Sequence, residues 1–230
     1  MLKKSYEFNL PHFNERPKEA IIDTIVIHYT EKIDDTAWYK AALEIGVSAH
    51  YLINKQGKIY SVVPDNFRAW HAGESFWRGR KKINDCSIGI ELDNNGQEEF
   101  SKNLMASLIE LCHELILNHP IDPFNIIGHA DIAPGRKSDP GKLFDWRLLA
   151  QNSIGIMPKN LLQTTIPDIK VVQSMLAKYG YKIDITGIKD QKTLDVMHAF
   201  NEHFNQQCSK NWDLNSQMML EALLRLNQER

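Results

Sequence analysis

The chain has 230 residues, of which 43% are hydrophobic and 24% are charged, a composition typical of a soluble globular protein. This length suffices for one medium domain and a small one, or for a single large domain. A formal net charge of −2 gives no basis for binding nucleic acid or membranes through charge alone. The three cysteines are widely separated and lack C-x-x-C spacing, which excludes a disulfide framework.

The first 150 residues predict strands that alternate with helices. The strand-like stretches are apolar and β-branched, or form a hairpin about an Asn-Lys-Gln-Gly turn, and lie at residues 20–30, 49–64, 87–92 and 124–129. The helical stretches have capping residues or leucines at helical spacing, and lie at residues 34–46 and 98–119. This alternation predicts an α/β domain with a mixed central β-sheet flanked by helices.

The character of the sequence changes after Trp146. Residues 151–168 are low in charge, contain two prolines and show no periodicity, so we interpret them as a linker between domains. Three helical patterns follow, and Gly180 after the first of them is a typical helix stop. We therefore expect a first domain over residues 1–150 and a small three-helix domain over residues 169–230.

The segment GHADIAPGRKSDPG, residues 128–141, combines titratable side chains with two prolines that disfavour a continuous helix. His129 opens this ordered loop and His28 closes the first strand, both at strand ends where open α/β sheets place ligands. With Asp139 they form three ligands that leave a fourth position for water, as catalytic zinc requires. A core histidine bonded to a backbone carbonyl is an equal alternative for either imidazole alone, and no H-E-x-x-H pattern singles out zinc.

Five stretches in this order, VIHYT, SAHYLINKQGKIYSVVP, AWHAG, NDCSIGIELDNNG and GHADIAPGRKSDPG, closely resemble the zinc-dependent N-acetylmuramoyl-L-alanine amidases of the type 2 family. That family also includes phage lysozyme-like amidases and the peptidoglycan recognition proteins, whose fold the resemblance implies. The likeness covers roughly residues 20–148 and is greatest to the bacterial branch that acts on muropeptides, including 1,6-anhydro forms. Residues 169–204 resemble the peptidoglycan-binding three-helix module that is often fused to such amidases.

The resemblance implies that Zn2+ is held by His28, His129 and Asp139. It further implies that Glu91 is the general base, which takes a proton from water during attack on the amide carbonyl. Lys137 matches the catalytic lysine of the family, whose fixed cation stabilises the oxyanion. Without the resemblance, Glu91 reads as a half-exposed strand glutamate and Lys137 as a solvated loop lysine.

Six further side chains are candidates for substrate contacts: Asn84, His71, Trp70, Arg136, Tyr29 and His50. For Tyr29 and His50 the alternative is packing and hydrogen bonding inside the sheet. Arg136 and the basic run at residues 78–82 are candidates to meet the carboxylates of a peptide stem. Solvated loop charges are the alternative for that run.

The activity that the resemblance implies is hydrolysis of the amide between N-acetylmuramic acid and L-alanine in peptidoglycan or muropeptides, with Zn2+ as cofactor. A peptidoglycan-binding protein that does not cleave is the first alternative, and a zinc carboxypeptidase acting on the same stem is the second. We expect no nucleic-acid partner and no membrane span. The accessory module favours the cell envelope or periplasm, whereas the start of the sequence shows no signal peptide, which is compatible with the cytoplasm.

Overall fold

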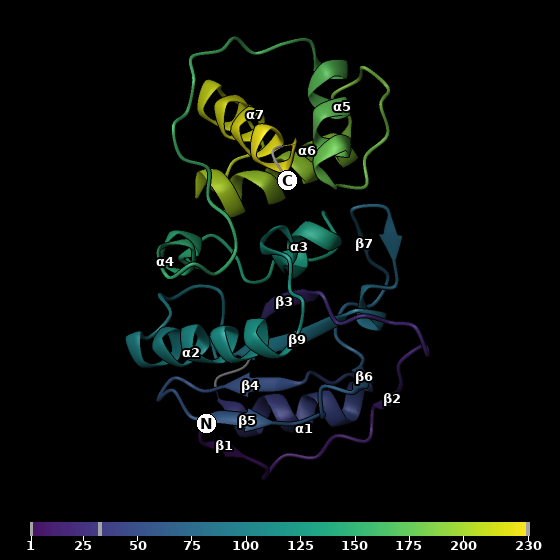
Figure 1. Ribbon diagram of the computed structural model, residues 1–230, viewed down its shortest axis with the longest axis vertical. Helices are drawn as coiled ribbons and strands as arrows, with labels where there is room; N and C mark the ends of the chain where they lie inside the picture. Colours follow the sequence, from purple (N-terminus) through teal and green to yellow (C-terminus); the bar gives the residue numbers. More distant parts are fainter. Residues whose placement is uncertain (1, 32–33, 229–230) are drawn as a thin grey trace.

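A computed structural model describes residues 2–31 and 34–228 of the chain. A six-stranded sheet with its flanking helices forms one end of the molecule, and the C-terminal helices form the other (Figure 1). The chain begins beside the sheet and reaches the C-terminal helices last (Figure 1).

The central sheet is mixed, as the sequence predicts. Its strands follow the order β1 (Lys4–Ser5), β5 (Ile59–Ser61), β4 (Tyr51–Ile53), β9 (Ser87–Leu92), β3 (Thr24–Tyr29) and β10 (Ile126–Gly128). Neighbouring strands are parallel except β4 and β5, which form the predicted antiparallel hairpin. Two antiparallel pairs of short strands that the sequence analysis did not predict lie outside this sheet: β2 (Phe13–Glu15) with β6 (Phe67–Ala69), and β7 (Phe76–Trp77) with β8 (Arg80–Lys81).

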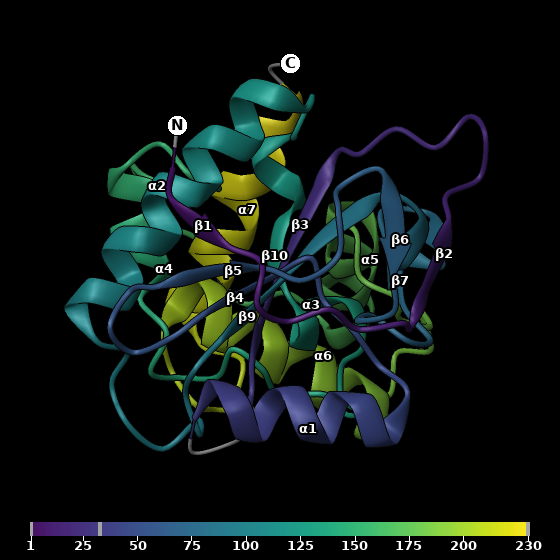
Figure 2. The same cartoon turned by 90° about the horizontal axis from the view of Figure 1, so that it is seen from below.

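Two helices cover opposite faces of the sheet (Figure 2). Helix α2 (Lys102–Asn118) buries a row of leucines in the same core cluster as Ile25 and Ile27 of β3. Helix α1 (Asp35–Ile45) packs Trp38 against Leu52 of β4 on the other face. Both helices start at caps that satisfy their first N–H groups, because the side chains of Asp34 and Ser101 accept hydrogen bonds from backbone nitrogens three residues on.

The side chains of β3 alternate between the two faces, as the period of a strand requires. Ile25 and Ile27 face α2, whereas Val26 belongs to the core cluster on the other face. His28 follows Val26 by two residues and therefore lies on the face opposite α2. The register pairs His28 with Glu91 of β9, so these two side chains leave the sheet on the same side.

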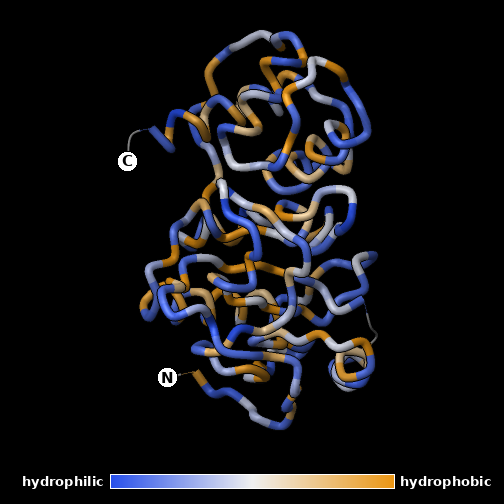
Figure 3. The backbone as a smooth tube through the Cα atoms, turned by 90° about the vertical axis from the view of Figure 1, so that its right-hand side faces the viewer, coloured by the Kyte–Doolittle hydropathy of each residue, from blue (hydrophilic) through white to orange (hydrophobic). Residues whose placement is uncertain are grey.

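The C-terminal domain contains the three predicted helices, α5 (Ile169–Tyr179), α6 (Gln191–Phe200) and α7 (Leu214–Gln228). Its apolar side chains share one continuous core cluster with residues of the sheet domain. The members from the sheet domain are Val26, Ala72, Trp77, Ile83, Phe124, Ile127, Ala130 and Ile132. Hydrophobic segments occur in both halves of the molecule (Figure 3). The C-terminal domain is therefore docked through buried contacts.

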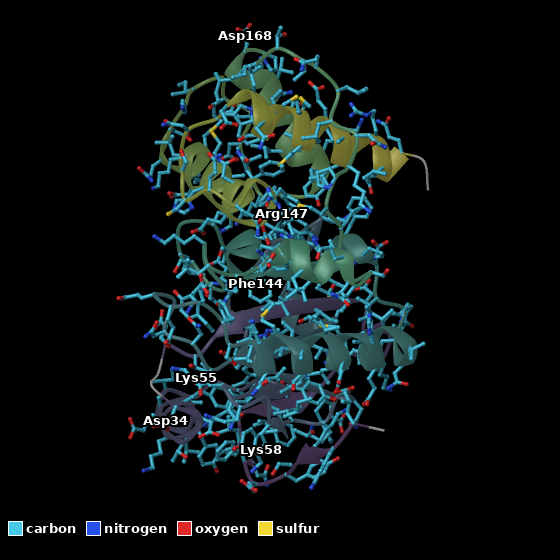
Figure 4. All side chains as sticks on the ribbon, turned by 90° about the vertical axis from the view of Figure 1, so that its left-hand side faces the viewer. Asp34, Lys55, Lys58, Phe144, Arg147 and Asp168 are labelled. Atoms are coloured by element: carbon cyan, nitrogen blue, oxygen red, sulfur yellow. The ribbon has the colours of Figure 1, made fainter. Side chains whose placement is uncertain are left out.

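The segment that joins the two halves follows α4 (Trp146–Gln151) and runs to the first residue of α5. Phe144 and Arg147 lie midway along the molecule, whereas Asp168, before α5, lies at the end opposite Lys58 (Figure 4). The limits of domains and linker given above stay predictions.

The loop at residues 128–141 differs from the sequence expectation in one respect, because it begins with a short helix, α3 (His129–Ile132). The Asp131 carboxylate accepts a hydrogen bond from the backbone N–H of Gly128 at 2.8 Å and so caps this turn. Pro134 follows soon after, which agrees with the expectation that no helix continues through the loop. Among the helices of the described residues, none is long and apolar enough to cross a bilayer.

Candidate metal centre and active site

The three predicted zinc ligands converge on one buried point. His28 comes from the end of β3, His129 from the first residue of α3, and Asp139 from the loop that follows. The His28 Nδ1 atom lies 3.0 Å from His129 Nδ1 and 2.8 Å from Asp139 Oδ2. The remaining pair, His129 Nδ1 and Asp139 Oδ2, is 3.1 Å apart.

This donor set fits zinc. Tetrahedral zinc with nitrogen and oxygen ligands at 2.0–2.1 Å holds its ligand atoms about 3.3 Å apart, close to the separations observed here. Burial, followed by the neighbouring His129, lowers the pKa of His28 to about 4. Burial alone would raise the pKa of Asp139, but the adjacent His129 and His28 hold it below its usual value. At neutral pH the site therefore offers a neutral imidazole and a carboxylate, the forms that bind metal.

The second nitrogen of each imidazole is also engaged. His129 Nε2 donates to the carbonyl oxygen of Ala72 at 3.1 Å. His28 Nε2 lies 3.0 Å from His71 Nδ1, and His71 Nε2 lies 3.1 Å from Ser87 Oγ. Such outer partners fix the tautomer and the ring orientation of metal-binding histidines. Here they direct both Nδ1 atoms toward the common point.

His71 and Asn84, predicted as substrate contacts, are buried behind the ligands. Asn84 lies in the short 3-10 helix η1 (Ile83–Asp85), and its Oδ1 atom accepts hydrogen bonds from the backbone nitrogens of His71 and Ala72 at 3.1 and 2.8 Å. The two side chains thus support the two imidazoles. A Cβ atom at Gly89 would collide with the His71 ring, so glycine in β9 lets that ring lie against the sheet.

Glu91 stands beside the ligands on β9. Its Oε2 atom is inaccessible and has no hydrogen-bond partner among the described residues. Burial, and then the negative charge of Asp139, raise the pKa of the Glu91 carboxyl well above its ordinary value, while Lys137 acts in the opposite direction. A carboxyl group in such a setting is suited to accept and return a proton near neutral pH.

Lys137 is exposed on the loop between Ile132 and Asp139. The loop bends there, because the backbone N–H groups of Arg136 and Lys137 both donate to the carbonyl oxygen of Ala133 at 3.1 Å. The positive charge of Lys137 lowers the pKa of both Glu91 and His28.

Of the three other predicted residues, Tyr29 and Arg136 have contacts near the ligands, whereas the indole N–H of Trp70 donates to Asn14 Oδ1 at 2.8 Å. Tyr29 exchanges a hydrogen bond with Ser138 at 2.9 Å. Arg136 donates to the carbonyl oxygens of Ala72 and Glu74 at 2.9 and 2.6 Å, and thus braces the carbonyl that holds His129. Trp70 is 38% exposed, which leaves its ring available to a ligand.

The prediction of His50 as a substrate contact is wrong. Its side chain is 0% exposed. Its Nδ1 atom accepts a hydrogen bond from the backbone N–H of Gly89 at 2.9 Å, and its Nε2 atom donates to the carbonyl oxygen of Phe67 at 3.1 Å. His50 is therefore a structural residue that joins β9 to β6, the alternative given for it above.

Sequence reasoning missed the role of Asp131. Besides capping α3, its buried carboxylate accepts hydrogen bonds from the Tyr181 hydroxyl at 2.6 Å and from His203 Nδ1 at 2.8 Å. His203 also stacks on Trp146 with ring centroids 3.8 Å apart. The sequence shows that Asp131 follows His129 by two residues, but it does not show which residues bind its carboxylate. These partners, Tyr181 and His203, lie 50 and 72 residues away along the chain.

Comparison with known proteins agrees with this geometry. The family model described as N-acetylmuramoyl-L-alanine amidase matches residues 17–142, and these include every ligand and Glu91. The chain belongs to this family. It is 36% identical over 231 residues to N-acetylmuramoyl-L-alanine amidase AmiD of Escherichia coli (strain K12), covering 88% of this chain and 82% of that protein.

Two solved structures resemble the whole chain. The complex of E. coli AmiD with anhydro-N-acetylmuramic acid-L-Ala-D-gamma-Glu-L-Lys has a TM-score of 0.84 at 32% identity and covers 95% of this chain and 99% of that one. Pseudomonas aeruginosa AmpDh3 in complex with anhydromuramic pentapeptide has a TM-score of 0.84 at 27% identity and covers 99% of both chains. The C-terminal helices are thus part of the shared architecture.

Proposed function

We propose that the protein hydrolyses the amide between N-acetylmuramic acid and L-alanine in muropeptides, including their 1,6-anhydro forms. Family membership gives the amidase activity. The observation that carries the proposal is the convergence of His28, His129 and Asp139 beside a carboxyl group, Glu91, whose Oε2 atom has no partner among the described residues. A site that only bound glycan or peptide would gain nothing from this costly arrangement.

The two imidazoles and the Asp139 carboxylate would hold Zn2+, which supplies a Lewis acid at the scissile carbonyl. Glu91 takes a proton from the attacking water as the new C–O bond forms. Lys137, on the exposed loop that leads to Asp139, stabilises the negative charge that develops on the carbonyl oxygen. When the C–N bond breaks, Glu91 returns the proton to the departing amine of L-alanine, and the muramic acid lactyl group keeps the new carboxylate.

The choice of anhydro sugars is supported by the relatives. AmiD was crystallised with an anhydro-N-acetylmuramic acid tripeptide. In addition, 1,6-anhydro-N-acetylmuramyl-L-alanine amidase AmpD of Haemophilus influenzae is 37% identical over 166 residues, covering 64% of this chain and 90% of that protein. Tyr29 and Arg136, which contact Ser138 and the carbonyl oxygen of Ala72, lie near the ligands and supply contacts for the sugar or the stem.

Mass spectrometry of defined substrates tests this proposal. A muramoyl tripeptide and its anhydro form are incubated with the purified protein, after chelation and after zinc is restored. We expect release of the intact L-alanine-led peptide, loss of release on chelation, and recovery with zinc. Intact substrate in every zinc-loaded sample would move the assignment to a peptidoglycan-binding protein, and release of a C-terminal amino acid would move it to a carboxypeptidase.

We also propose the cell envelope as the place of action. The support is the resemblance of residues 169–204 to peptidoglycan-binding modules. Fractionation of cells that produce the native chain tests this proposal, since recovery only in the cytoplasmic fraction would contradict it.

A further inference from the structure

A second group of metal-ligating side chains lies in the C-terminal domain, outside the site described above. It consists of His198 on α6, Glu202 in the π-helix η3 (Asn201–Asn205), and Cys208 in the loop before α7. One ligand atom from each of the three lies within 4.8 Å of the other two. His198 Nδ1 is 3.4 Å from Glu202 Oε2, and His198 Nε2 is 3.8 Å from Cys208 Sγ.

The backbone that carries these side chains is fixed by contacts of its own. His198 and Glu202 are four residues apart, a spacing that places both side chains on one face of a helix. The buried side chain of Asn201 donates to the carbonyl oxygens of Ser209 and Asn211 at 2.9 and 2.8 Å, and these residues flank Cys208 closely. Lys210 forms an ion pair with Asp195 at 2.9 Å. The loop therefore holds the thiol against α6 before any ligand arrives.

Burial makes a cation favourable at this point. Glu202 is only 9% exposed, and a buried carboxylate is costly unless a cation or a metal compensates its charge. The Cys208 thiol, by contrast, is exposed. An ion can thus enter from solvent on the thiol side and meet the carboxylate on the buried side.

We propose that His198, Glu202 and Cys208 bind a second divalent metal ion, with Zn2+ as the favoured ion and water as a fourth ligand. Thiolate, imidazole and carboxylate together suit zinc and related ions of borderline softness better than Mg2+ or Ca2+, which prefer oxygen. Glu202 lies nearest to Nδ1 of His198 and Cys208 lies nearest to Nε2, so the His198 ring must turn until one nitrogen faces both partners before the three can share an ion. This inference concerns residues that the proposed amidase chemistry does not use, so it stands independently of that function.

The position of this second site gives it a connection to the first. A cavity of about 280 Å3 is lined on one wall by His198 and Glu202, and on the other by Lys137 and Ser138 of the loop that carries Asp139. A metal ion on the first wall therefore faces the same solvent space as the Lys137 ammonium group.

Cobalt spectroscopy distinguishes the two sites, because only the second contains sulfur. Metal-free full-length protein is titrated with Co2+ under reducing conditions, and the thiolate-to-cobalt charge-transfer absorption in the near ultraviolet is recorded. We expect two bound equivalents, of which one produces this absorption. Cys208→Ser should remove the absorption and one equivalent, while Asp139→Ala should keep the absorption. Glu202→Gln, with the thiol intact, should weaken cobalt binding at the second site by more than about tenfold.

Two results would overturn the proposal. One is a titration in which the unmodified protein and Cys208→Ser bind the same number of equivalents and neither shows charge-transfer absorption. The other is an absorption that persists in Cys208→Ser, which would assign it to Cys86 or Cys112. Circular dichroism of each variant shows whether it is folded, and the exposed position of Cys208 makes its serine variant the least disruptive choice.

Discussion

The imidazole of His203 donates a hydrogen bond from Nδ1 to the carboxylate of Asp131 at 2.8 Å, and so joins the C-terminal domain to the helix that begins with His129, a candidate metal ligand. The carboxylate can only accept, which fixes the proton on His203 Nδ1. Its Oδ2 atom also accepts from the Gly128 N–H, the residue directly before His129. A contact made by the C-terminal domain thus reaches the metal centre through one carboxylate.

Replacement of His203 by alanine should therefore affect both stability and metal binding. Removal of this donor leaves a buried carboxylate with one partner fewer, which costs about 1–3 kcal/mol. It also removes the stacking on Trp146. We expect a lower midpoint of urea unfolding and weaker zinc binding in a competition assay with a chromophoric chelator. His12→Ala, which removes a half-buried histidine bonded to the carbonyl oxygen of Leu43, is the control and should leave zinc binding unchanged.

Glu91→Gln should separate proton transfer from metal binding. The amide has nearly the same shape as the carboxyl group but cannot accept the proton from water, so we expect kcat to fall by a factor of about 10²–10⁴. Zinc content, measured by atomic absorption, should remain at one equivalent or more. A variant that retains kcat would remove Glu91 from its assigned role.

The same substitution should also change how the stability of the metal-free protein depends on pH. The pKa of Glu91 is raised in the folded protein, chiefly by burial, so the folded state holds the proton more tightly than the unfolded state does. The carboxyl group therefore favours folding below its ordinary pKa of 4.5, and this contribution is lost as the pH rises above that value. We expect metal-free Glu91→Gln to be the more stable protein at pH 7 and to lose this advantage near pH 4. Urea unfolding at both pH values measures the difference.

His129→Ala should abolish tight zinc binding, because two remaining protein ligands seldom hold the ion. Activity should disappear with the metal and should not return at moderate zinc excess. Because the second group of ligands in the C-terminal domain would still bind metal, cobalt spectra rather than total metal content give the decisive reading. A variant with an unchanged cobalt d–d spectrum and unchanged activity would contradict the ligand assignment.

Gly89→Ala tests whether the contact between His71 and His28 Nε2 contributes to metal binding. The added Cβ atom meets the His71 ring, which must move and thereby release its contact with His28 Nε2. Zinc affinity should fall by about 10–100-fold, the usual effect of disturbing an outer partner of a metal ligand. In a His71→Ala background the same substitution should have little further effect. An equally large effect in both backgrounds would locate the damage elsewhere, for example in the bond from Gly89 N–H to His50.

Sequence patterns predicted those parts of the fold in which a local signal agrees with the tertiary structure. The strand expected over residues 87–92 is β9 without change, because an apolar run of that length suits a strand in the middle of a parallel sheet. The leucines at helical spacing predicted a helix over residues 98–119, and helix α2 occupies Lys102–Asn118 of that range. The expectation of strands ending at His28 and near His129 placed two candidate metal ligands at one sheet edge.

Other features depend on partners that lie far away in the chain. The role of Asp131 depends on Tyr181 and His203, and that of Arg136 on the carbonyl of Ala72, so no local pattern reveals them. His50 was a candidate for a substrate contact, with hydrogen bonding inside the sheet as the alternative. In a sheet covered on both faces, however, alternation alone does not show which side chains reach solvent.

The continuous core between the two halves has a consequence for truncation. A chain shortened to end near Gln151 would present Trp77, Phe124 and Ile127 to water in place of the helices that now cover them. Such a fragment would carry every ligand of the metal centre and yet would be prone to self-association through this uncovered apolar area. The C-terminal domain therefore cannot be removed or transferred without exposing apolar residues of the sheet domain. Grafting it onto another enzyme, or removing it from this one, would require a redesigned polar surface on the sheet domain.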